Sequence, residues 1–427
     1  MNRKNNLSNS CSARLGTASS DRNIFESEDP DPFPPSDPDV SHSDDEEPPG
    51  TGSRLGKPVL KIIKKKSMNI PKPIFKERMI KKMRVGLTFD LREDYLAMNY
   101  SMEETAELDS PETIEALELS LQKLGYDTIR IGGIESLVEK LAAGERWDMV
   151  FNIAEGMHGM GRESQIPALL DAYRIPYTFS DPLVLGITLH KGITKHILKN
   201  LGIATADFIV VNTLSDLDSH KLPFPLFAKP AAEGTGKGIS GRSLVHSDME
   251  LREICGDLLS EFKQPVLVET FLPGREFTVG ILGTGAGARA LKPMEVIFSG
   301  EAGEECYSYE MKKNYEDRVD YSLVSGELGK ACEDLALAAW RGLGCRDGGR
   351  IDLRLDPEGK PRVIEANPLA GLHPVDSDLP ILCRLSGISY ELLIKRIMDS
   401  ALERQVDGKG VLDEIKKHFN SLQPARR

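Results

Sequence analysis

Three segments of the chain carry side chains that could act on a phosphorylated substrate, and the first surrounds a glycine-rich loop. In PLFAKPAAEGTGKGIS, at 225–240, a strand-like run ends in Lys229 and a loop follows. Glycines let backbone N–H groups approach phosphate oxygens closely, and a lysine adds countercharge. The loop fits neither G-x-x-x-x-G-K-[ST] nor G-x-G-x-x-G, so a flexible loop without a ligand is an equally good interpretation. The loop residues that could contact phosphate are Gly234, Thr235, Gly236 and Gly238.

The second segment, PVLVETFLPGREFTV at 265–279, places acids at the ends of two strands. Glu269 ends the first strand, close to Leu272, and Glu276 follows the Pro-Gly turn. An acid at a strand end near an apolar residue could hold the amino group or the hydroxyls of a nucleoside. Single carboxylates at a sheet edge are also common on ordinary protein surfaces, and that interpretation stays open.

The third segment, GRIDLRLDPEGKPRVIEANPLAG at 349–371, predicts two strands joined by a tight turn. Glu365 and Asn367 are two residues apart, so both point to one face, and Asp352 can lie opposite them. Two carboxylates and an amide form an all-oxygen set that suits Mg²⁺. Arg350 shares the face of Asp352 and could stabilise developing negative charge. An exposed polar face without a ligand fits the same pattern.

An α/β fold must position these side chains, and its first part is a run of alternating strands and helices. A Ser-Pro-Glu start at 110–112 and a stop at Gly125 bound the first long helix. The alternation predicts right-handed βαβ units and a parallel sheet, with functional residues at the carboxyl ends of strands. The segment from Glu155 to Ser164 follows such an end. We expect strands at 83–89, 128–131 and 147–153, and helices at 111–124 and 134–143.

The rest of the chain supplies the strands that carry the three segments. A helix at 185–201 carries Lys191, and a closing helix is expected at 390–402, before a polar tail. Further strands are expected at 208–211, 226–229, 266–271, 277–282, 349–355 and 362–366.

The composition is that of a globular enzyme. The 427 residues carry a formal net charge of -12, which argues against a nucleic-acid partner. No apolar run approaches the roughly 18 residues that a transmembrane helix needs. Because the N-terminus lacks the apolar core of a secretory signal, we expect a cytoplasmic protein. The six cysteines lie far apart and without zinc spacing, which favours reduced thiols.

The N-terminal stretch differs from the rest of the chain in composition. The first 50 residues are rich in Pro, Ser, Asp and Glu, and this composition predicts disorder. Residues 54–84 are rich in lysine with almost no acids. A solvated linker is the favoured interpretation of this basic stretch, and a site for an anionic partner is the alternative.

Together, the three segments resemble those of ATP-grasp enzymes, and within them D-alanine–D-alanine ligase. The resemblance covers 83–402, and its most specific motifs are GRID at 349–352 and EAN followed by Gly371. It implies an α/β ATP-grasp architecture with an N-terminal Rossmann-like parallel-sheet domain, preceded by a disordered tail. The implied units are an N-terminal extension at 1–82, the N-terminal domain at 83–183, a central ATP-grasp subdomain at 184–272, a C-terminal catalytic subdomain at 273–404 and a polar tail at 405–427.

The resemblance also implies roles for individual residues. Lys191 and Lys229 look like the lysines that bind the ATP phosphates, and the loop from Gly234 to Gly238 looks like the cover over them. Arg350 and Gly371 resemble the groups that stabilise the oxyanion. The implied adenosine contacts are Glu269, Leu272 and Glu276. The implied metal ligands are Asp352, Glu365 and Asn367. The other implied catalytic residues are Glu163 and, in a loop that closes over the phosphates, Tyr309 and Lys312.

The implied reaction is ATP-dependent ligation of a carboxylate to an amine through an acyl phosphate, with Mg²⁺ or, alternatively, Mn²⁺. The implied partners are small amino-acid-like substrates and a second copy of the chain in a homodimer. Two alternatives stay open. One is an ATP-grasp kinase, which phosphorylates a substrate and stops. The other is a regulatory protein that binds nucleotide without turnover, which the full set of presumed metal ligands and phosphate lysines disfavours.

The chain departs from the family where the amino acids are bound. The family's glycine-rich turn after the first strand is replaced by FDLREDYLAMNY, and its H-G-x-x-G-E-D becomes HGMGRES at 158–164. Asp376 stands where the family places a serine that holds the second substrate's carboxylate, and an ionised Asp repels a carboxylate. We therefore expect substrates other than two D-alanines. Of the histidines, His373 is the best candidate for a substrate contact, although lone histidines are more often structural.

Overall fold

The computed structural model describes residues 82–298 and 319–421, with the backbone alone at 298 and 406–421. The described residues belong to one unit, which spans 77–427. The extension predicted at 1–82, except for residue 82, lies outside the described residues, as do Tyr309 and Lys312. The domain boundaries predicted within the unit stay predictions.

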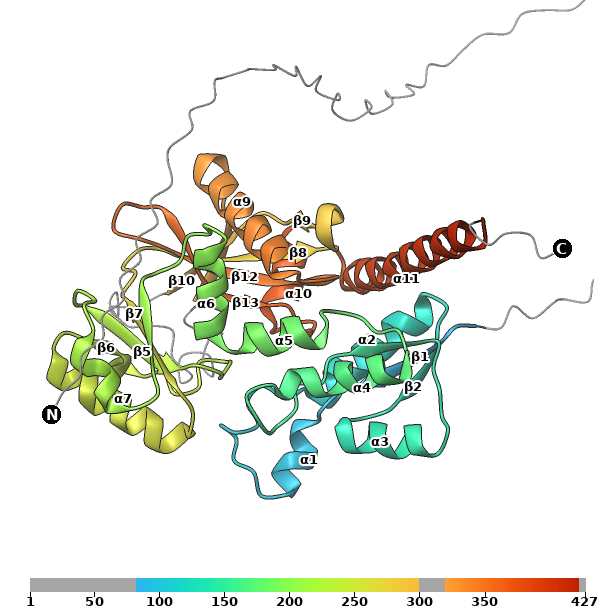
Figure 1. Cartoon of the computed structure of the whole chain (residues 1–427), viewed down its shortest axis with the longest axis horizontal. Helices are drawn as coiled ribbons and strands as arrows, with labels where there is room; N and C mark the ends of the chain where they lie inside the picture. The colour runs from blue at the N-terminus through green and yellow to red at the C-terminus, as the bar shows by residue number, and fades with distance from the viewer. Residues whose placement is uncertain (1–81, 299–318, 422–427) are drawn as a thin grey trace, which may run out of the picture. The chain divides into compact units, whose positions relative to one another are not determined.

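A three-stranded parallel sheet begins the described chain, as the alternating pattern predicts (Figure 1). β1 (Arg84–Thr88) lies in the middle, between β2 (Asp127–Arg130) and β3 (Met149–Asn152). The loops after β1 and β3 meet at the carboxyl edge, where the Gly156 N–H donates to Asp90 Oδ2 at 2.9 Å. The accompanying helices are α1 (Arg92–Ala97), α2 (Pro111–Lys123), α3 (Ile134–Ala142) and α4 (Gln165–Tyr173), and the short 3₁₀ helix η1 (Arg162–Ser164) precedes α4.

Each face of this sheet buries its own apolar cluster, because successive side chains of a strand point to opposite faces. Val85 and Leu87 of β1 pack with α2 and with the long helix α11 (Tyr390–Ser421). Val150 of β3 belongs to the other cluster, which includes residues of α3 and α4. The first cluster therefore joins the N-terminal sheet to a helix from the end of the chain.

A second, antiparallel sheet carries the glycine-rich loop. Its strand order is β4-β7-β5-β6. Helix α7 (Asp248–Phe262) packs against this sheet through a shared apolar cluster. The strands are β4 (Phe208–Val211), β5 (Leu226–Pro230), β6 (Leu244–Val245) and β7 (Val266–Thr270), and the 3₁₀ helices η2 (Leu214–Ser219) and η3 (Gly241–Ser243) lie in its connections.

The single helix predicted at 185–201 is wrong, because the chain forms two helices there. These are α5 (Pro182–Leu189) and α6 (Lys191–Asn200), and His190 separates them. His190 has φ −85° and ψ 89°, and its ring nitrogen Nδ1 accepts the Ile193 N–H at 3.3 Å. The break makes Lys191 the first residue of α6 instead of a mid-helix residue.

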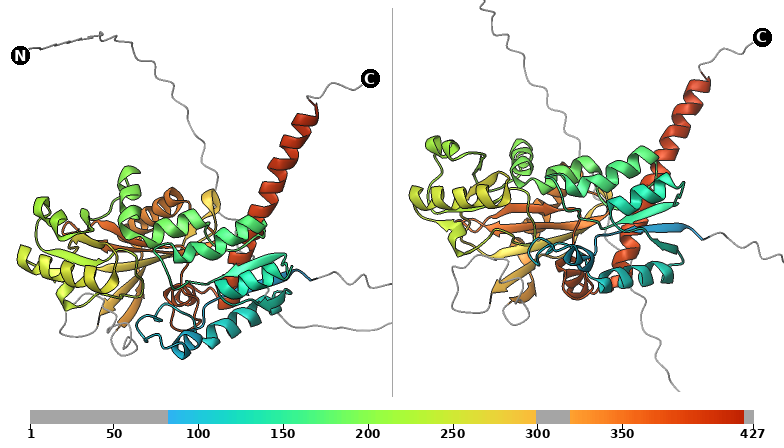
Figure 2. Two further views of the ribbon diagram at one scale, coloured as in Figure 1. Left: turned by 60° about the horizontal axis from the view of Figure 1, so that its bottom comes forward. Right: turned by 90° about the horizontal axis from the view of Figure 1, so that it is seen from below.

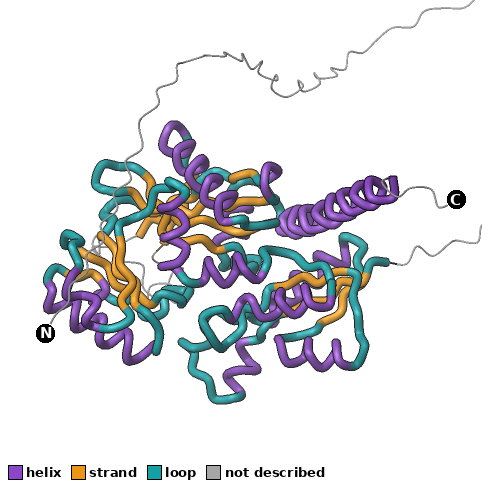
Figure 3. The backbone as a smooth tube through the Cα atoms, in the orientation of Figure 1, coloured by secondary structure: helices purple, strands orange, loops and turns teal. Residues whose placement is uncertain are grey.

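The third sheet is the largest and is antiparallel. Its strand order is β11-β10-β8-β12-β13, with β9 paired to β8 at one side. Figure 3 shows the strands in three groups that correspond to the three sheets. The strands are β8 (Glu276–Leu282), β9 (Arg289–Ala290), β10 (Met294–Phe298), β11 (Val319–Leu323), β12 (Gly348–Leu355) and β13 (Pro361–Asn367), and η4 (Gly285–Gly287) precedes β9.

Helices lie on both faces of this sheet (Figure 2). Ile351 and Leu353 of β12 pack with Trp340 of α9 (Gly326–Leu343). On the opposite face Gly280 lies against Leu379 and Leu382 of α10 (Asp378–Leu385). The even-numbered residues of β12 point to the face on which α10 lies, and these include the residues predicted to bind metal and oxyanion.

The last helix is longer than predicted. α11 runs from Tyr390 to Ser421, beyond the expected end at 402 and through most of the predicted polar tail. Within the described residues no helix is long and apolar enough to cross a membrane.

Candidate active site

Two adjoining cavities lie between the sheets. The larger has a volume of about 630 Å³, and the smaller about 120 Å³. The larger lies within the range of small-molecule sites, about 300–1,000 Å³. The cavities share lining residues from α6, the glycine-rich loop, the β12–β13 hairpin and α10, which are Lys191, Glu233, Gly234, Thr235, Arg350, Glu365 and Asp378. A ligand in one cavity can therefore meet a ligand in the other beside these side chains.

The β12–β13 hairpin forms as predicted and gathers the three presumed metal ligands. In the strand register, Asp352 lies opposite Glu365, and Arg350 lies opposite Asn367. The Asn367 Nδ2 lies 3.0 Å from Asp352 Oδ2 and 3.4 Å from Glu365 Oε1. Burial raises the pKa of Asp352, and the nearby charges of Glu365 and Asp378 raise it further, against the effect of Arg350. The hairpin thus concentrates negative charge at one end of the smaller cavity.

Arg350 faces both carboxylates of this region. Its Nη1 pairs with Asp352 Oδ2, and its Nε lies 3.7 Å from Asp378 Oδ2. Burial opposes the positive charge, but Asp352 and Asp378 raise the pKa of Arg350, so the guanidinium stays ionised. A charged donor held between two acids is oriented before any substrate arrives.

Lys191 approaches the same cluster from the start of α6. Its Nζ donates to the Glu233 carbonyl of the glycine-rich loop and lies 3.5 Å from Glu365 Oε2. Only a small part of the residue, 9% of its surface, is exposed. The break at His190 therefore places a lysine between the presumed metal ligands and the loop that follows β5.

Glu269 lies between two buried lysines. Its Oε1 is 3.0 Å from Lys195 Nζ, and its Oε2 is 3.0 Å from Lys229 Nζ. Although burial opposes ionisation, the two ammonium groups hold the pKa of Glu269 below its usual value. The cluster fixes the side chain of Lys229 at the edge of the smaller cavity, which Glu269 and Lys229 both line.

The other presumed nucleoside contacts also line the smaller cavity. Leu272 is 9% exposed, and Glu276 lies 3.6 Å from Arg354 Nη1. Phe227 and Phe271 add aromatic surface to the same wall. A narrow cavity with apolar walls and acids at its rim can hold a flat base and a sugar.

The glycine-rich loop is anchored to the N-terminal part by Glu107. Glu107 Oε1 accepts the Gly234 N–H at 2.5 Å, and Glu107 Oε2 pairs with Arg162 at 2.7 Å. Lys237 lies 3.3 Å from Glu107 Oε1 and 2.6 Å from Glu233 Oε2. Arg162 and Lys237 thus both neutralise the charge of Glu107. These contacts hold the glycine-rich loop beside the cavities, and its residues Thr235, Gly236 and Gly238 have left-handed backbone conformations.

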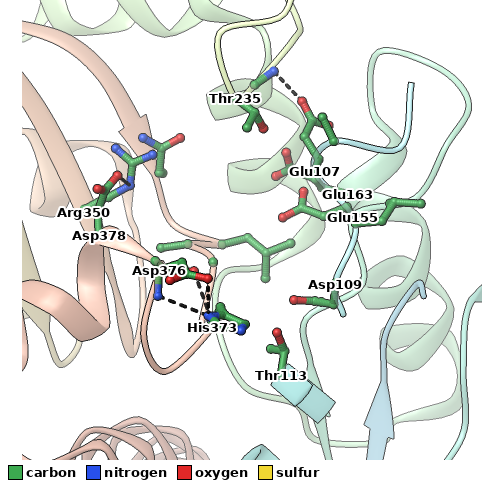
Figure 4. Close-up of a pocket in the computed structure, with 18 of the residues that line it drawn as sticks. Glu107, Asp109, Thr113, Glu155, Glu163, Thr235, Arg350, His373, Asp376 and Asp378 are labelled. Carbon is green, nitrogen blue, oxygen red and sulfur yellow. Dashed lines mark hydrogen bonds and ion pairs between the residues drawn. The ribbon is translucent and has the colours of Figure 1, made fainter. Parts of the chain in front are cut away.

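Three further acids of the N-terminal part point into the larger cavity, namely Asp109, Glu155 and Glu163 (Figure 4). The pKa of Glu163 is raised to about 8, mainly by burial and also by the charge of Glu107, while Arg162 and Lys191 act in the opposite direction. Burial also raises the pKa of Asp109 to about 8, with a contribution from Asp90. The pKa of Glu155 is raised by burial and by the charges of Glu163 and Glu107. Arg92, Arg162 and Lys191 act against these increases, but within the described chain none of them forms an ion pair with the three acids.

The opposite wall is formed by the loop between β13 and α10. The His373 ring Nδ1 lies 3.1 Å from Asp376 Oδ2, and the Asp376 N–H donates to the same nitrogen (Figure 4). The His373 N–H donates to Ser377 Oγ at 3.0 Å. A side chain at Gly371 would meet this Ser377 hydroxyl at 2.8 Å, so Gly371 keeps the loop close to the cavity.

The structure thus brings together most of the residues proposed from sequence. The residues Lys191, Gly234, Thr235 and Glu365 border both cavities, while Gly238 lies beyond them, packed on Pro230 and Phe262. Sequence reasoning did not single out Glu107, Asp109 or Asp378 as site residues. Glu107 and Asp109 lie just before the predicted helix start at 110–112. Two acids so close to that start were the feature of the sequence that could have indicated them.

The large sheet, the glycine-loop sheet and the parallel-sheet domain together define an ATP-grasp protein. A solved D-alanine–D-alanine ligase from Bacillus anthracis, complexed with ATP, superposes with a TM-score of 0.58 at 22% identity. The match covers 76% of this chain and 99% of that one. At this identity the likeness establishes the fold.

Sequence relatives identify the family. The family model described as D-ala D-ala ligase C-terminus matches residues 197–399. A D-alanine–D-alanine ligase of Bordetella petrii is 33% identical over 274 residues, 63% of this chain and 80% of that protein. A D-alanine–D-alanine ligase of Aquifex aeolicus is 32% identical, over 68% of this chain and 94% of that protein. An uncharacterised protein of Sinorhizobium fredii is 30% identical, over 70% and 89%. The chain belongs to the D-alanine–D-alanine ligase family.

Proposed function

We propose that this chain is an ATP-dependent ligase that joins a carboxylate to an amine, and that its substrates differ from a pair of D-alanines. Membership of the D-alanine–D-alanine ligase family supports the ATP-dependent ligation. The observation that carries the proposal is the junction of the two cavities at Lys191, Arg350 and Glu365. A phosphoryl donor in the small cavity and an acceptor in the large one would meet at these charged groups.

The smaller cavity is the proposed ATP site. Glu269, Leu272 and Glu276 would contact the adenosine, and Lys229 and Lys191 would bind the phosphates. The loop from Gly234 to Gly238 would cover the phosphates, with Thr235 and Gly236 on the cavity side. The ammonium group of Lys191 contacts the Glu365 carboxylate and the Glu233 backbone carbonyl, so an arriving phosphate would replace these protein oxygens with phosphate oxygens.

Asp352, Glu365 and Asn367 would hold Mg²⁺, and the chemistry of the side chains fits that ion. All three carry oxygen donors, and Asn367 lies within hydrogen-bond range of both carboxylates. The assignment of its amide oxygen and nitrogen can be reversed, so that the oxygen faces the ion. No group of three His, Cys, Asp or Glu side chains in the described chain is arranged as a metal site, which agrees with an ion that takes its other ligands from phosphate and water. Bound Mg²⁺ would supply countercharge to the phosphates, and Mn²⁺ could replace it.

The proposed reaction has two steps. In the first, an oxygen of the substrate carboxylate attacks the γ-phosphorus of ATP, the bond to the bridging oxygen breaks and ADP leaves. In the second, the amine attacks the acyl carbon of the acyl phosphate, phosphate leaves and the nitrogen gives up a proton. Arg350 and the backbone at Gly371 would stabilise the negative charge that develops on the acyl oxygen. Tyr309 and Lys312 would keep water from the acyl phosphate, and Glu163 would contact the substrate.

The loop between β13 and α10, which lines the larger cavity, favours the proposal that the substrates are not two D-alanines. Asp376 would face the carboxylate of a second amino acid, and its charge would repel that group. Ser377 offers a hydroxyl one residue later in the same cavity, but a carboxylate bound there would still lie close to Asp376. A small amine without a carboxylate would meet no such repulsion.

Three further properties belong to the same proposal, and of these the homodimer derives from the family. The chain would act as a homodimer and in the cytoplasm. The boundaries of its units would be those at 82, 183, 272 and 404, which place the glycine-rich loop and the β12–β13 hairpin in different subdomains.

The test is ADP and phosphate release by the full chain with Mg-ATP. The panel contains D-alanine alone, other D- and L-amino acids, and these acids paired with small amines. We expect release of both products only with a pair that includes an acceptor other than D-alanine. Release with D-alanine alone, with formation of the dipeptide, would overturn our interpretation of Asp376. ADP without free phosphate would indicate a kinase instead of a ligase.

A further inference from the structure

The N-terminal wall of the larger cavity has more carboxyl groups than the nearby cations pair with. Asp109, Glu155 and Glu163 all line the cavity, and none of their carboxyl groups has a hydrogen bond or an ion pair with another described residue. Glu107 differs, because Arg162 and Lys237 both pair with it. Three carboxylates are therefore left uncompensated on one wall.

The cations close to this wall are already engaged elsewhere. Arg92 donates to the backbone carbonyls of Thr105, Ala106 and Leu108, at 3.1, 2.9 and 3.1 Å. Arg162 donates to the Ala232 carbonyl at 2.9 Å in addition to its pair with Glu107. These contacts hold the loop before α2 and the glycine-rich loop in place, and among the described residues neither guanidinium forms an ion pair with the three acids.

A metal ion does not explain the three acids. Among the described residues, no three acids or other ligand side chains converge closely enough to hold a metal ion. The cavity of about 630 Å³ is instead large enough for an organic ligand. Ammonium groups are compact donors of several hydrogen bonds, and carboxylates spread along a wall suit such groups.

We propose that the larger cavity binds a substrate with two ammonium groups, a diamine or a diamino acid, whose cationic ends lie against Asp109, Glu155 and Glu163. This inference rests on the proposed function, since it names the substrate class of the same site. One ammonium group, even if it bridged two of the carboxylates, would leave the third unpaired. Two would match all three, because an ammonium group can bridge two carboxylates.

The opposite wall fits the uncharged or anionic part of the same substrate. Arg350 lies across the cavity from the three acids (Figure 4). A diamino acid could place its carboxylate at Arg350 and both ammonium groups at the acidic wall. A diamine would place both ammonium groups at the same acidic wall.

Calorimetric titration of the full chain with matched ligands tests this inference. The titrations are made with Mg²⁺ and a non-hydrolysable ATP analogue. Diaminobutane is compared with butylamine, and ornithine with norvaline, because each pair differs in one ammonium group. We expect the diammonium member of at least one pair to bind tenfold or more tightly than its partner. The pair that shows the difference distinguishes a diamine from a diamino acid. Equal binding within both pairs, or no binding of any of the four, would overturn the proposal.

Variants that remove one charge without changing shape provide the second arm. Glu163→Gln, Glu155→Gln and Asp109→Asn should each weaken diammonium binding by about tenfold or more. Glu139→Gln, at an exposed position of α3, should leave it unchanged. Binding of the ATP analogue shows that each variant is folded. Unchanged diammonium binding in all three folded variants would contradict the assigned wall.

The failure of this inference can be told apart from failure of the proposed function. If the chain releases ADP and phosphate with a monoamino acid and a monoamine, and binds neither diammonium ligand more tightly than its monoammonium partner, the ligase assignment stands and the substrate class is wrong. If diammonium ligands bind through the three acids and no amide forms with any carboxylate, the binding wall stands and the ligase assignment is wrong.

Discussion

Asp352 is the side chain on which the proposed metal site depends most. It accepts a hydrogen bond from Asn367, pairs with Arg350 and lies opposite Glu365 in the hairpin. Asp352→Asn should lower the rate of phosphate release by roughly a hundredfold or more, because the loss of charge weakens metal binding and leaves Arg350 without its partner. Assays over a range of Mg²⁺ concentrations measure the effect. Asp127→Asn, at an exposed position of β2, is the matched control and should retain full activity. Equal rates in the two variants would remove Asp352 from the site.

Glu163 should make the stability of the free protein depend on pH. Its folded-state pKa of about 8 lies above that of an unfolded glutamate, so the folded state binds more protons between these values. The free energy of unfolding therefore falls as pH rises from about 4.5 to about 8, and the loss is complete above that range. Glu163→Gln removes this dependence. Relative to wild type, the variant should gain at least about 1.4 kcal/mol between pH 5 and pH 8, as thermal unfolding at both values can measure. If the free energies of unfolding of the two proteins differ by the same amount at pH 5 and at pH 8, Glu163 is ionised in the folded protein at both values.

Single residues also show how far the sequence alone could lead. The two-residue spacing of Glu365 and Asn367 predicted their shared face, because strand periodicity is local. Glu107 could not be found this way. Its role depends on Gly234, which lies 127 positions away, and on Arg162, and no local pattern encodes such contacts.

At the scale of elements, short-range geometry decided which predictions succeeded. The β12–β13 hairpin and the parallel sheet follow from alternation and turn residues, and both are confirmed. The helix at 185–201 failed because apolar periodicity continues through His190, while the histidine ring caps a new helix there. The end predicted for α11 was also wrong, since the polar residues beyond 403 continue the helix.

The glycine-rich loop gives a prediction at this scale. Gly236 has φ 74°, a conformation that costs an L-residue roughly 1–2 kcal/mol. Gly236→Ala should raise the KM for ATP by about fivefold or more, because the loop would no longer keep its conformation over the phosphates. Gly202→Ala is the matched control, since Gly202 has φ 71° after α6 and open space around its Cα. It should lower thermal stability by a similar amount and leave the KM unchanged. Equal KM values in the two variants would argue that the loop does not touch ATP.

At the scale of the whole described molecule, one buried carboxylate ties together segments that lie far apart in the chain. Asp347, before β12, accepts the Phe179 N–H at 2.7 Å from the end of the parallel-sheet part. It also accepts from Thr284 at 3.1 Å and, on α11, from Ser400 at 2.8 Å and Arg404 Nε at 3.0 Å. Asp347 is fully buried. The parallel-sheet part, β8 and β12 all carry residues that line the cavities, so the relative placement of these walls depends on this carboxylate.

Asp347→Asn should therefore destabilise the whole described unit. The substitution leaves Arg404 without its charged partner and replaces one acceptor oxygen with a donor, so we expect a loss of about 3–5 kcal/mol in the free energy of unfolding. Urea denaturation followed by circular dichroism measures it. Asp399→Asn, on α11 like Arg404, is the control, because the ion pair of Asp399 among the described residues is with the half-exposed Lys395, and a loss of at most about 1 kcal/mol is expected. If the two variants unfold at the same urea concentration, Asp347 does not hold the segments together. If Asp347→Asn is destabilised and also binds ATP less tightly at a temperature where it is folded, the carboxylate sets the geometry of the site as well as the stability of the fold.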